Sequence, residues 1–163
     1  MTSRKPRMCV VTTTPLIIHF FFTKHLHELS KYFDVTLIMN KELDSYLGDI
    51  DVSISVITVP IERKVHILND LRSLFKITKI MCKEKFDVVV SISPKAGLLG
   101  MSGAFVASTS KRVHVFQGEI WAAKRFLSRF LLKGLDKITA WCATDILAVS
   151  ESEKQFLIKE RVT

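Results

Sequence analysis

Short apolar segments alternate with longer amphipathic segments along most of the chain. The short segments hold five to nine residues, many of them β-branched, which is typical of strands buried in a parallel sheet. They comprise residues 8–13, 34–39, 52–60, 86–94, 112–116 and 145–150. Six strands separated by helices predict an α/β fold, a doubly wound, Rossmann-like parallel sheet flanked by helices.

The longer segments carry apolar residues at helical spacing. Helices are therefore expected at residues 22–31, 64–85, 96–109 and 122–142, and after residue 150. In the second of these, one face is formed by Leu68, Leu71, Phe75 and Met81. For the last helix we expect Ser150 or Ser152 as the N-terminal cap, with Glu153 in the first turn.

Length and composition indicate one globular domain over residues 1–163, since 48% of residues are hydrophobic and 25% are charged. The mean hydropathy of +0.25 raises the question of a membrane span. The longest apolar run, residues 15–22, is interrupted by His19 and is far shorter than the roughly 20 residues that a spanning helix needs. Neither a spanning segment nor a secretory signal peptide is expected.

The net charge of +8 predicts an anionic partner, which could be nucleic acid, anionic lipid headgroups or a phosphorylated ligand. Nucleic acid fits less well, because the chain has no recognition motif and no basic groove interleaved with aromatic residues. Cys9, Cys82 and Cys142 are odd in number, widely spaced and embedded in apolar segments. They predict buried, reduced thiols in a cytosolic protein, and no residues have the spacing of metal ligands.

The residues that directly follow each strand are the candidates for ligand binding, because ligands bind at the carboxyl ends of the strands in such sheets. The first such corner, residues 12–19, contains Thr14, Pro15 and His19. It lacks the glycine pattern of a dinucleotide site, and no phosphate-binding P-loop occurs elsewhere. For each of these residues, ordinary turn chemistry is the alternative interpretation.

The second corner, residues 93–100, places Lys95 and Gly97 where a helix begins. Backbone N–H groups and an ammonium group could meet an anion there. For the glycines we favour the alternative that Gly97, Gly100 and Gly103 let this helix pack closely on the sheet. For Lys95 both interpretations stay open.

The third corner, residues 117–121, ends an apolar strand abruptly with Gln117, Gly118, Glu119 and Trp121. Glu119 could cap the next helix, and Trp121 could close the edge of the core. Taken together at one corner, however, these residues favour a ligand site at the rim of a cleft.

The helix predicted at residues 122–142 carries five basic residues against the single acid Asp136, with Leu127, Leu131, Leu135 and Ile138 behind the basic stripe. One interpretation is a core helix with a solvated basic face. The other is a helix that lies on an anionic membrane surface. The residues expected to contact the membrane are Lys124, Arg125, Phe126, Arg129, Phe130 and Lys133.

Residues 93–107 and 111–160, including the stretch KRVHVFQGEIW, resemble the N-terminal half of glycosyltransferase family 4 enzymes, particularly those that build capsules, O-antigens and other surface polysaccharides. Residues 12–40 are similar to the first strand, helix and strand of that family. The resemblance implies half of a GT-B fold, in which an acceptor-side domain faces a nucleotide-sugar-binding domain across a cleft. The donor-binding domain, with the family's paired glutamates, is expected to be absent from these residues.

The resemblance implies a retaining transferase that passes a sugar from a nucleotide-sugar to a lipid-linked saccharide at the cytoplasmic face of the cell membrane. It implies no cofactor or metal in this chain. Many relatives have a histidine where this chain has Gln117. Because the leaving phosphate of such enzymes is thought to take the acceptor proton, a neutral amide that hydrogen-bonds the sugar can replace that imidazole.

Three explanations of a lone acceptor-side domain stay open: a truncation, a gene fragment, or one subunit of a two-chain enzyme. The isolated domain is expected to be inactive. The alternative function is a non-catalytic, membrane-anchoring subunit that recruits a separate donor-binding chain. An unrelated α/β domain that binds a small ligand or nucleic acid would require the resemblance to be fortuitous.

Overall fold

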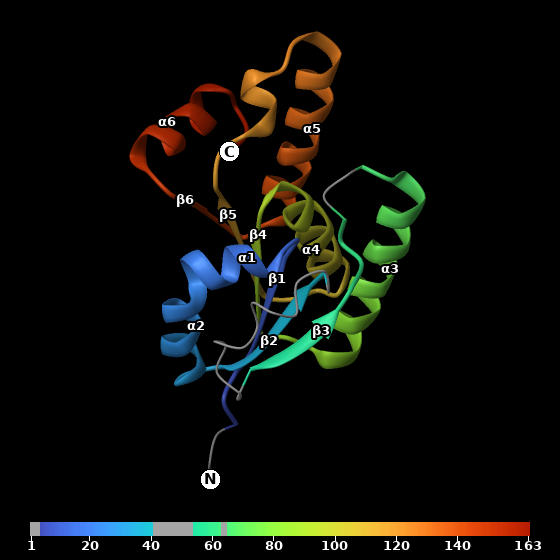
Figure 1. The fold of residues 1–163 in the computed structure, drawn as a ribbon, viewed down its shortest axis with the longest axis vertical. Helices are drawn as coiled ribbons and strands as arrows, with labels where there is room; N and C mark the ends of the chain where they lie inside the picture. Colours follow the sequence, from blue (N-terminus) through green and yellow to red (C-terminus); the bar gives the residue numbers. More distant parts are fainter. Residues whose placement is uncertain (1–3, 41–53, 63–64) are drawn as a thin grey trace.

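A computed structural model describes residues 4–40, 54–62 and 65–163 of the chain. Its core is a six-stranded sheet in the order β3-β2-β1-β4-β5-β6, and every pair of neighbouring strands is parallel (Figure 1). The strands are β1 (Arg7–Thr12), β2 (Asp34–Met39), β3 (Ser55–Thr58), β4 (Val88–Ile92), β5 (Lys111–Phe116) and β6 (Asp145–Ala148). The predicted doubly wound parallel sheet is confirmed.

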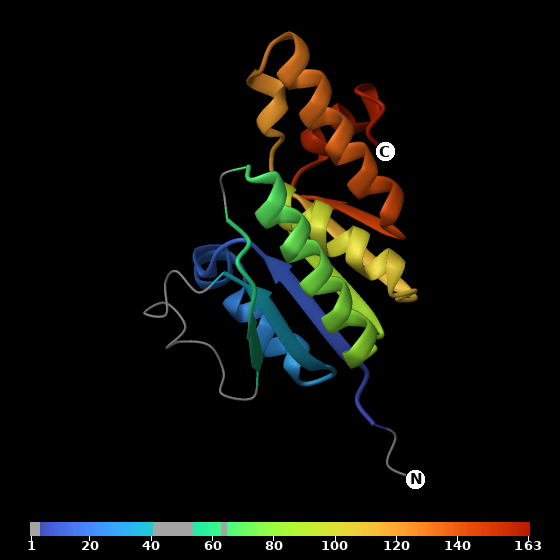
Figure 2. The ribbon, with the colours of Figure 1, turned by 90° about the vertical axis from the view of Figure 1, so that its right-hand side faces the viewer.

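The helices cover both faces of this sheet. Helices α3, α4 and α5 lie side by side on one face (Figure 2), while α1 and α2 lie against the other. Their bounds are α1 (Pro15–Ile17), α2 (Thr23–Ser30), α3 (Ile67–Glu84), α4 (Pro94–Val106), α5 (Phe126–Cys142) and α6 (Glu151–Lys159). A π-helical turn, η1 (Ile18–Phe22), joins α1 to α2, and a 3-10 turn, η3 (Ile120–Ala123), precedes α5.

Strand β1 shows how the residue pattern builds two cores. Cys9 and Val11 point into the core beneath α3 and α4, whereas Met8 and Val10 point into the core beneath α1 and α2. All four side chains are buried, because a central parallel strand is covered on both faces. Continuous apolar runs therefore identified the strands correctly.

Several predicted boundaries shift in the structure. The strand expected at 52–60 forms at Ser55–Thr58, and residues 52–53 lie outside the described residues. The helix expected at 122–142 is divided, because Lys124 and Arg125 are extended between η3 and α5. The predicted cap of the last helix is confirmed at Ser150, whose Oγ accepts a hydrogen bond from the Glu153 N–H at 3.1 Å.

Of the four residues that the apolar pattern marked as one face of helix α3, only Met81 is buried. Leu68, with 73% of its surface exposed, and likewise Leu71 and Phe75 face outward. The inward face consists of Ser73, Ile77 and Met81. The neighbouring elements determine which side of the helix is buried, since Ser73 Oγ donates to the Pro60 carbonyl oxygen at 2.8 Å and Ile77 and Met81 lie against Gly103 of α4.

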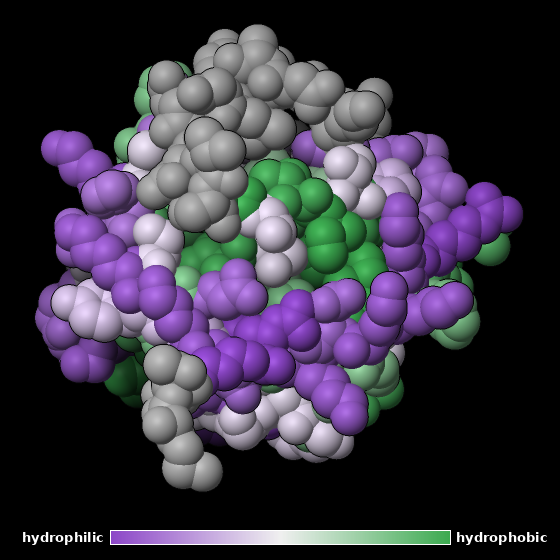
Figure 3. All heavy atoms as spheres, turned by 90° about the horizontal axis from the view of Figure 1, so that it is seen from below, coloured by the Kyte–Doolittle hydropathy of each residue, from purple (hydrophilic) through white to green (hydrophobic). Residues whose placement is uncertain are grey.

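Helix α5 repeats this arrangement. Its inward face consists of Asp136, Thr139 and Cys142, which are polar or small. The residues expected behind the basic stripe are exposed, namely Leu127, Leu131, Leu135 and Ile138. The helical layer of α3, α4 and α5 thus presents apolar side chains to the outside. At the end of the molecule near the N-terminus, by contrast, hydrophilic residues surround a smaller apolar area (Figure 3).

Cys9 and Cys142 are buried thiols, as predicted, but the expected burial of Cys82 is wrong, because it lies on an exposed side of α3. Within the described residues, no group of three or more His, Cys, Asp or Glu side chains could hold a metal ion. The helices of residues 4–40, 54–62 and 65–163 include none that is long and apolar enough to cross a bilayer.

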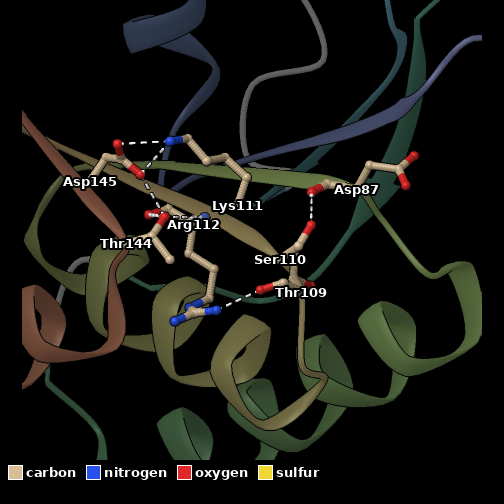
Figure 4. A network of polar contacts seen from close by, with 7 residues as sticks. All are labelled: Asp87, Thr109, Ser110, Lys111, Arg112, Thr144 and Asp145. Carbon is tan, nitrogen blue, oxygen red and sulfur yellow. Dashed lines mark hydrogen bonds and ion pairs between the residues drawn. The ribbon is translucent and has the colours of Figure 1, made fainter.

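A polar network fixes the amino ends of β5 and β6 (Figure 4). Lys111 Nζ pairs with a carboxylate oxygen of Asp145 at 2.8 Å, and Thr144 Oγ1 accepts a hydrogen bond from the Arg112 N–H at 2.9 Å. The Arg112 guanidinium also reaches back to the Cys142 carbonyl oxygen at 2.6 Å. These bonds tie the end of α5 to the start of β5. They lie at the amino ends of the strands, whereas the predicted site lies at the carboxyl ends.

His114 is a buried residue of β5 rather than a surface histidine. Its Nδ1 lies 2.8 Å from Ser91 Oγ, and its ring meets Phe116 edge-on with centroids 4.5 Å apart. A Cβ atom added at Gly97 would lie 2.4 Å from His114 Cε1, so the ring fills the space that glycine leaves. Burial lowers the pKa of His114 to about 4.

This histidine predicts a loss of stability in acid. The unfolded chain binds a proton on His114 below about pH 6.5, whereas the buried ring resists protonation down to about pH 4. The free energy of unfolding should therefore fall by up to about 3 kcal/mol as the pH falls across this window. Urea unfolding of the wild type and of His114→Gln, compared at each pH, separates this effect from the carboxylates. Equal pH dependence in both proteins would contradict the prediction.

Candidate functional site at the carboxyl ends of the strands

The strand order places β1 and β4 side by side, so the first and second corners meet at the point where the chain reverses direction across the sheet. Thr13 Oγ1 and Ser93 Oγ lie 3.3 Å apart and join the two corners. Thr14 is buried and caps α1, where its Oγ1 accepts a hydrogen bond from the Leu16 N–H at 3.4 Å. The structure thus gives Thr14 a role in the turn.

The other predicted residues of the first corner, Pro15 and His19, follow Thr14 in α1 and η1. Pro15 is buried at the first position of α1, and His19 lies half-buried in η1, edge-on to Phe20 with ring centroids 4.9 Å apart. The helix expected at residues 22–31 therefore begins earlier, at Pro15, and His19 lies in a helical turn rather than in a loop.

In the second corner, Lys95 is tied to α3. Its Nζ lies 2.7 Å from Asp70 Oδ1, and both side chains are largely buried. Gly97 faces His114 and Gly100 faces Val11, which matches the packing interpretation of these glycines. Of this corner's predicted cleft residues, only Lys95 therefore carries a functional group close to the strand ends.

The third corner is open to solvent. Gln117 and Gly118 are exposed, and a Cβ atom added at Gly118 would meet no atom within 4 Å. Gly118 has φ of +88°, a conformation that favours glycine. Its N–H donates to Glu153 Oε1, while the Val149 N–H donates to Glu153 Oε2 at 2.8 Å. Glu153, expected only as a first-turn acid, therefore fastens this corner to α6.

Three carboxyl groups gather beside this corner. Burial raises the pKa of Glu119, and the neighbouring carboxylates of Glu153 and Asp136 add to the shift. Burial also raises the pKa of Asp136, against the opposing effect of a hydrogen bond from Trp121. Glu119 occupies the N-cap position of η3, but its side chain makes no capping hydrogen bond, so the alternative interpretation as a side-chain cap is not confirmed.

Trp121 is buried at the edge of the core, which agrees with the structural interpretation of this residue. Its Nε1 donates to Asp136 Oδ2 at 2.7 Å, and its ring stacks on Phe156 with centroids 5.4 Å apart. Arg129 and Lys133 lie over the ring at 5.2 and 5.4 Å from its centroid. The indole therefore joins η3, α5 and α6.

The residues predicted to contact a membrane divide into two groups. Phe126 and Phe130 are 89% and 75% exposed, and Lys124 and Arg125 are exposed beside them. The other two basic residues turn toward α6, where Arg129 and Lys133 pair with Glu160 at 2.9 and 2.6 Å.

A cavity of about 420 Å³ lies at the carboxyl ends of β1 and β4, between α3, α4, η3 and α5. Its walls are largely aliphatic, with side chains that include Ile17, Val65, Leu98, Ile120, Leu132 and Leu135. No pattern in the sequence predicts this cavity. These residues come from five separate segments, so no local pattern could have shown that they converge.

Residues 11–141 match a protein family described as glycosyl transferase 4-like. The capsular polysaccharide biosynthesis glycosyltransferase CapM of Staphylococcus aureus is 35% identical over 130 residues, which are 78% of this chain and 33% of that protein. The UDP-Gal:alpha-D-GlcNAc-diphosphoundecaprenol alpha-1,3-galactosyltransferase of Escherichia coli is 31% identical over 135 residues, 80% of this chain and 34% of that protein. The chain thus spans about a third of the length of these relatives.

Solved structures share the fold. A putative UDP-N-acetylglucosamine 2-epimerase from Listeria monocytogenes matches with a TM-score of 0.74 at 18% identity, over 97% of this chain and 43% of that one. UGT89C1 of Arabidopsis thaliana, complexed with UDP, matches with a TM-score of 0.58 at 14% identity, over 98% and 50%. The predicted architecture, equivalent to one half of a GT-B enzyme, is confirmed.

The conformation of Gly118 gives a stability prediction with a matched control. Gly118→Ala should lower the free energy of unfolding by about 1–3 kcal/mol, because alanine is strained at positive φ. Gly134→Ala, at a helical glycine that also has open space, should instead stabilise the protein by about 1 kcal/mol. Urea unfolding measures both. A stabilising Gly118→Ala would show that this turn can relax.

Proposed function

Because the chain belongs to the glycosyl transferase 4-like family, we propose that it is the acceptor-side half of a retaining glycosyltransferase that extends a lipid-linked saccharide for a surface polysaccharide such as a capsule or O-antigen. The observation that carries this proposal is the 35% identity to a capsule glycosyltransferase over most of the chain. The name of the second relative, which includes a diphosphoundecaprenol acceptor, supports the lipid-linked class.

The donor is proposed to be a nucleotide-sugar that binds mainly to a second Rossmann-like domain, on the same polypeptide or on a separate chain. The third corner would face that domain. Its exposed Gln117 and the open space at Gly118 support this placement, because a sugar could approach the backbone there without displacing a side chain. Gln117 would hydrogen-bond a sugar hydroxyl, and Glu119 would line the same cleft.

This role predicts a loss of activity when the amide is removed. In a complete enzyme, made by joining this domain to a donor half, Gln117→Ala should lower kcat/KM about 2- to 10-fold, the worth of one hydrogen bond. Gln155→Ala, at an exposed glutamine of α6, is the matched control and should retain the full rate. Equal rates for both variants would remove Gln117 from the site. Inversion at the anomeric carbon of the product would overturn the retaining mechanism.

We further propose that α5 docks on the anionic inner face of the cell membrane. Phe126 and Phe130 protrude from this helix, and the exposed Lys124 and Arg125 lie at its start. The net charge of +8 complements an anionic surface. Because Arg129 and Lys133 are engaged by Glu160, the attraction would rest mainly on Lys124 and Arg125.

Vesicle sedimentation tests this docking. Replacing both Lys124 and Arg125 with Gln should weaken binding to phosphatidylserine-containing vesicles roughly 30-fold, at about 1 kcal/mol for each basic residue, and binding should weaken with salt. Phe126→Ser with Phe130→Ser should also weaken it. The matched control is Phe20→Ser with Phe21→Ser, two exposed aromatic residues of η1. If the control pair weakens binding as much, the site is not on α5.

A further inference from the structure

The polar groups that border the cavity beside β1 and β4 already have partners. Lys95 pairs with Asp70 at 2.7 Å, and Trp121 donates to Asp136 at 2.7 Å. The remaining wall is mostly aliphatic. A sugar, which carries a hydroxyl group on most of its carbon atoms, would lose its hydrogen bonds to water there and gain few in return. The cavity chemistry therefore favours an apolar ligand.

The cavity also opens onto apolar surface. Ile120 and Leu135 line it and are themselves exposed. Leu131 and Ile138 lie one helical turn from Leu135 along α5, and both are exposed. An apolar ligand that fills the cavity would therefore meet more apolar surface where it emerges, which suits an extended chain better than a compact molecule.

The position of the cavity relates it to the proposed reaction. It lies at the carboxyl ends of the strands, bounded by η3, whose first two residues, Ile120 and Trp121, belong to the third corner. A lipid-linked saccharide with its sugar at that corner would bring the start of its lipid close to this cavity. A volume of about 420 Å³ falls within the range of about 300–1,000 Å³ that is usual for small-molecule sites.

We propose that this cavity binds the polyisoprenoid chain of the acceptor lipid, next to its phosphate. This inference rests on the proposed function, and it adds that this domain recognises the lipid as well as the saccharide. An acceptor with too short a chain would leave the cavity unfilled and bind more weakly, since each buried methylene group adds to affinity.

Fluorescence of the purified chain tests binding directly. The chain has two tryptophans, Trp121 in the cavity wall and the exposed Trp141 on α5. In a Trp141→Phe background, the signal comes from Trp121 alone. Geranylgeranyl phosphate, added below its critical micelle concentration, should change this signal saturably, and inorganic phosphate should not displace it.

Two variants locate the binding. Ile120→Asp places a charge at the cavity wall and should weaken binding roughly tenfold or more. Val106→Asp is the matched control, because Val106 is 66% exposed, against 60% for Ile120, and lies at the far end of α4, outside the cavity wall. It should bind like the parent protein.

Four results would overturn the proposal. They are the absence of a saturable signal, equal weakening by both variants, displacement by inorganic phosphate, and a dimer that Ile120→Asp dissociates, which would identify a second copy as the occupant. The assay needs no sugar transfer. Failed transfer by a complete enzyme would therefore count against the proposed function alone, whereas failed binding with successful transfer would count against this cavity alone.

Discussion

The hydrogen bond between the buried Trp121 indole and Asp136 holds the third corner and the cavity in place. The bond is 2.7 Å long and joins η3 to α5, while the same ring stacks on Phe156 of α6. Burying a carboxylate or an indole N–H without a hydrogen bond costs free energy of folding. Losing either Trp121 or Asp136 would therefore leave the other with an unsatisfied buried group. Because η3 follows directly from the end of β5, the positions of the Gln117 corner and of the cavity wall both depend on this contact.

The second constraint is the orientation of the helices on the face opposite α2. Helices α3 and α5 expose apolar side chains, while their buried faces include polar residues, namely Ser73 on α3 and Asp136 and Thr139 on α5. Burying apolar surface contributes roughly 25 cal/mol of favourable free energy for each Å² removed from water, and this contribution is missing where the surface stays exposed. Large exposed apolar patches usually mark interaction surfaces. The proposed membrane surface and the proposed lipid chain would both cover exposed apolar side chains of the helical layer formed by α3, α4 and α5.

The sequence predicted where the candidate site lies, because the residues that follow parallel strands meet at one end of the sheet. The open turn at Gly118 and the solvent-facing Gln117 were found in this way. Glu153, which binds the Gly118 N–H, was missed because it lies on α6 and reaches the corner only in the folded chain. The glycines of α4 serve packing, as the sequence analysis favoured, since Gly97 lies against His114.

The sequence by itself determined the parallel sheet, because a strand covered on both faces is apolar over most of its length, as in β1 and β4. It also limited the cap of α6 to Ser150 or Ser152, since a cap bonds to a residue only a few positions away, as Ser150 does to Glu153. Only the tertiary structure decided which side of α3 and of α5 is buried. Periodicity locates an apolar stripe on a helix, but packing against neighbouring elements decides whether that stripe faces the core.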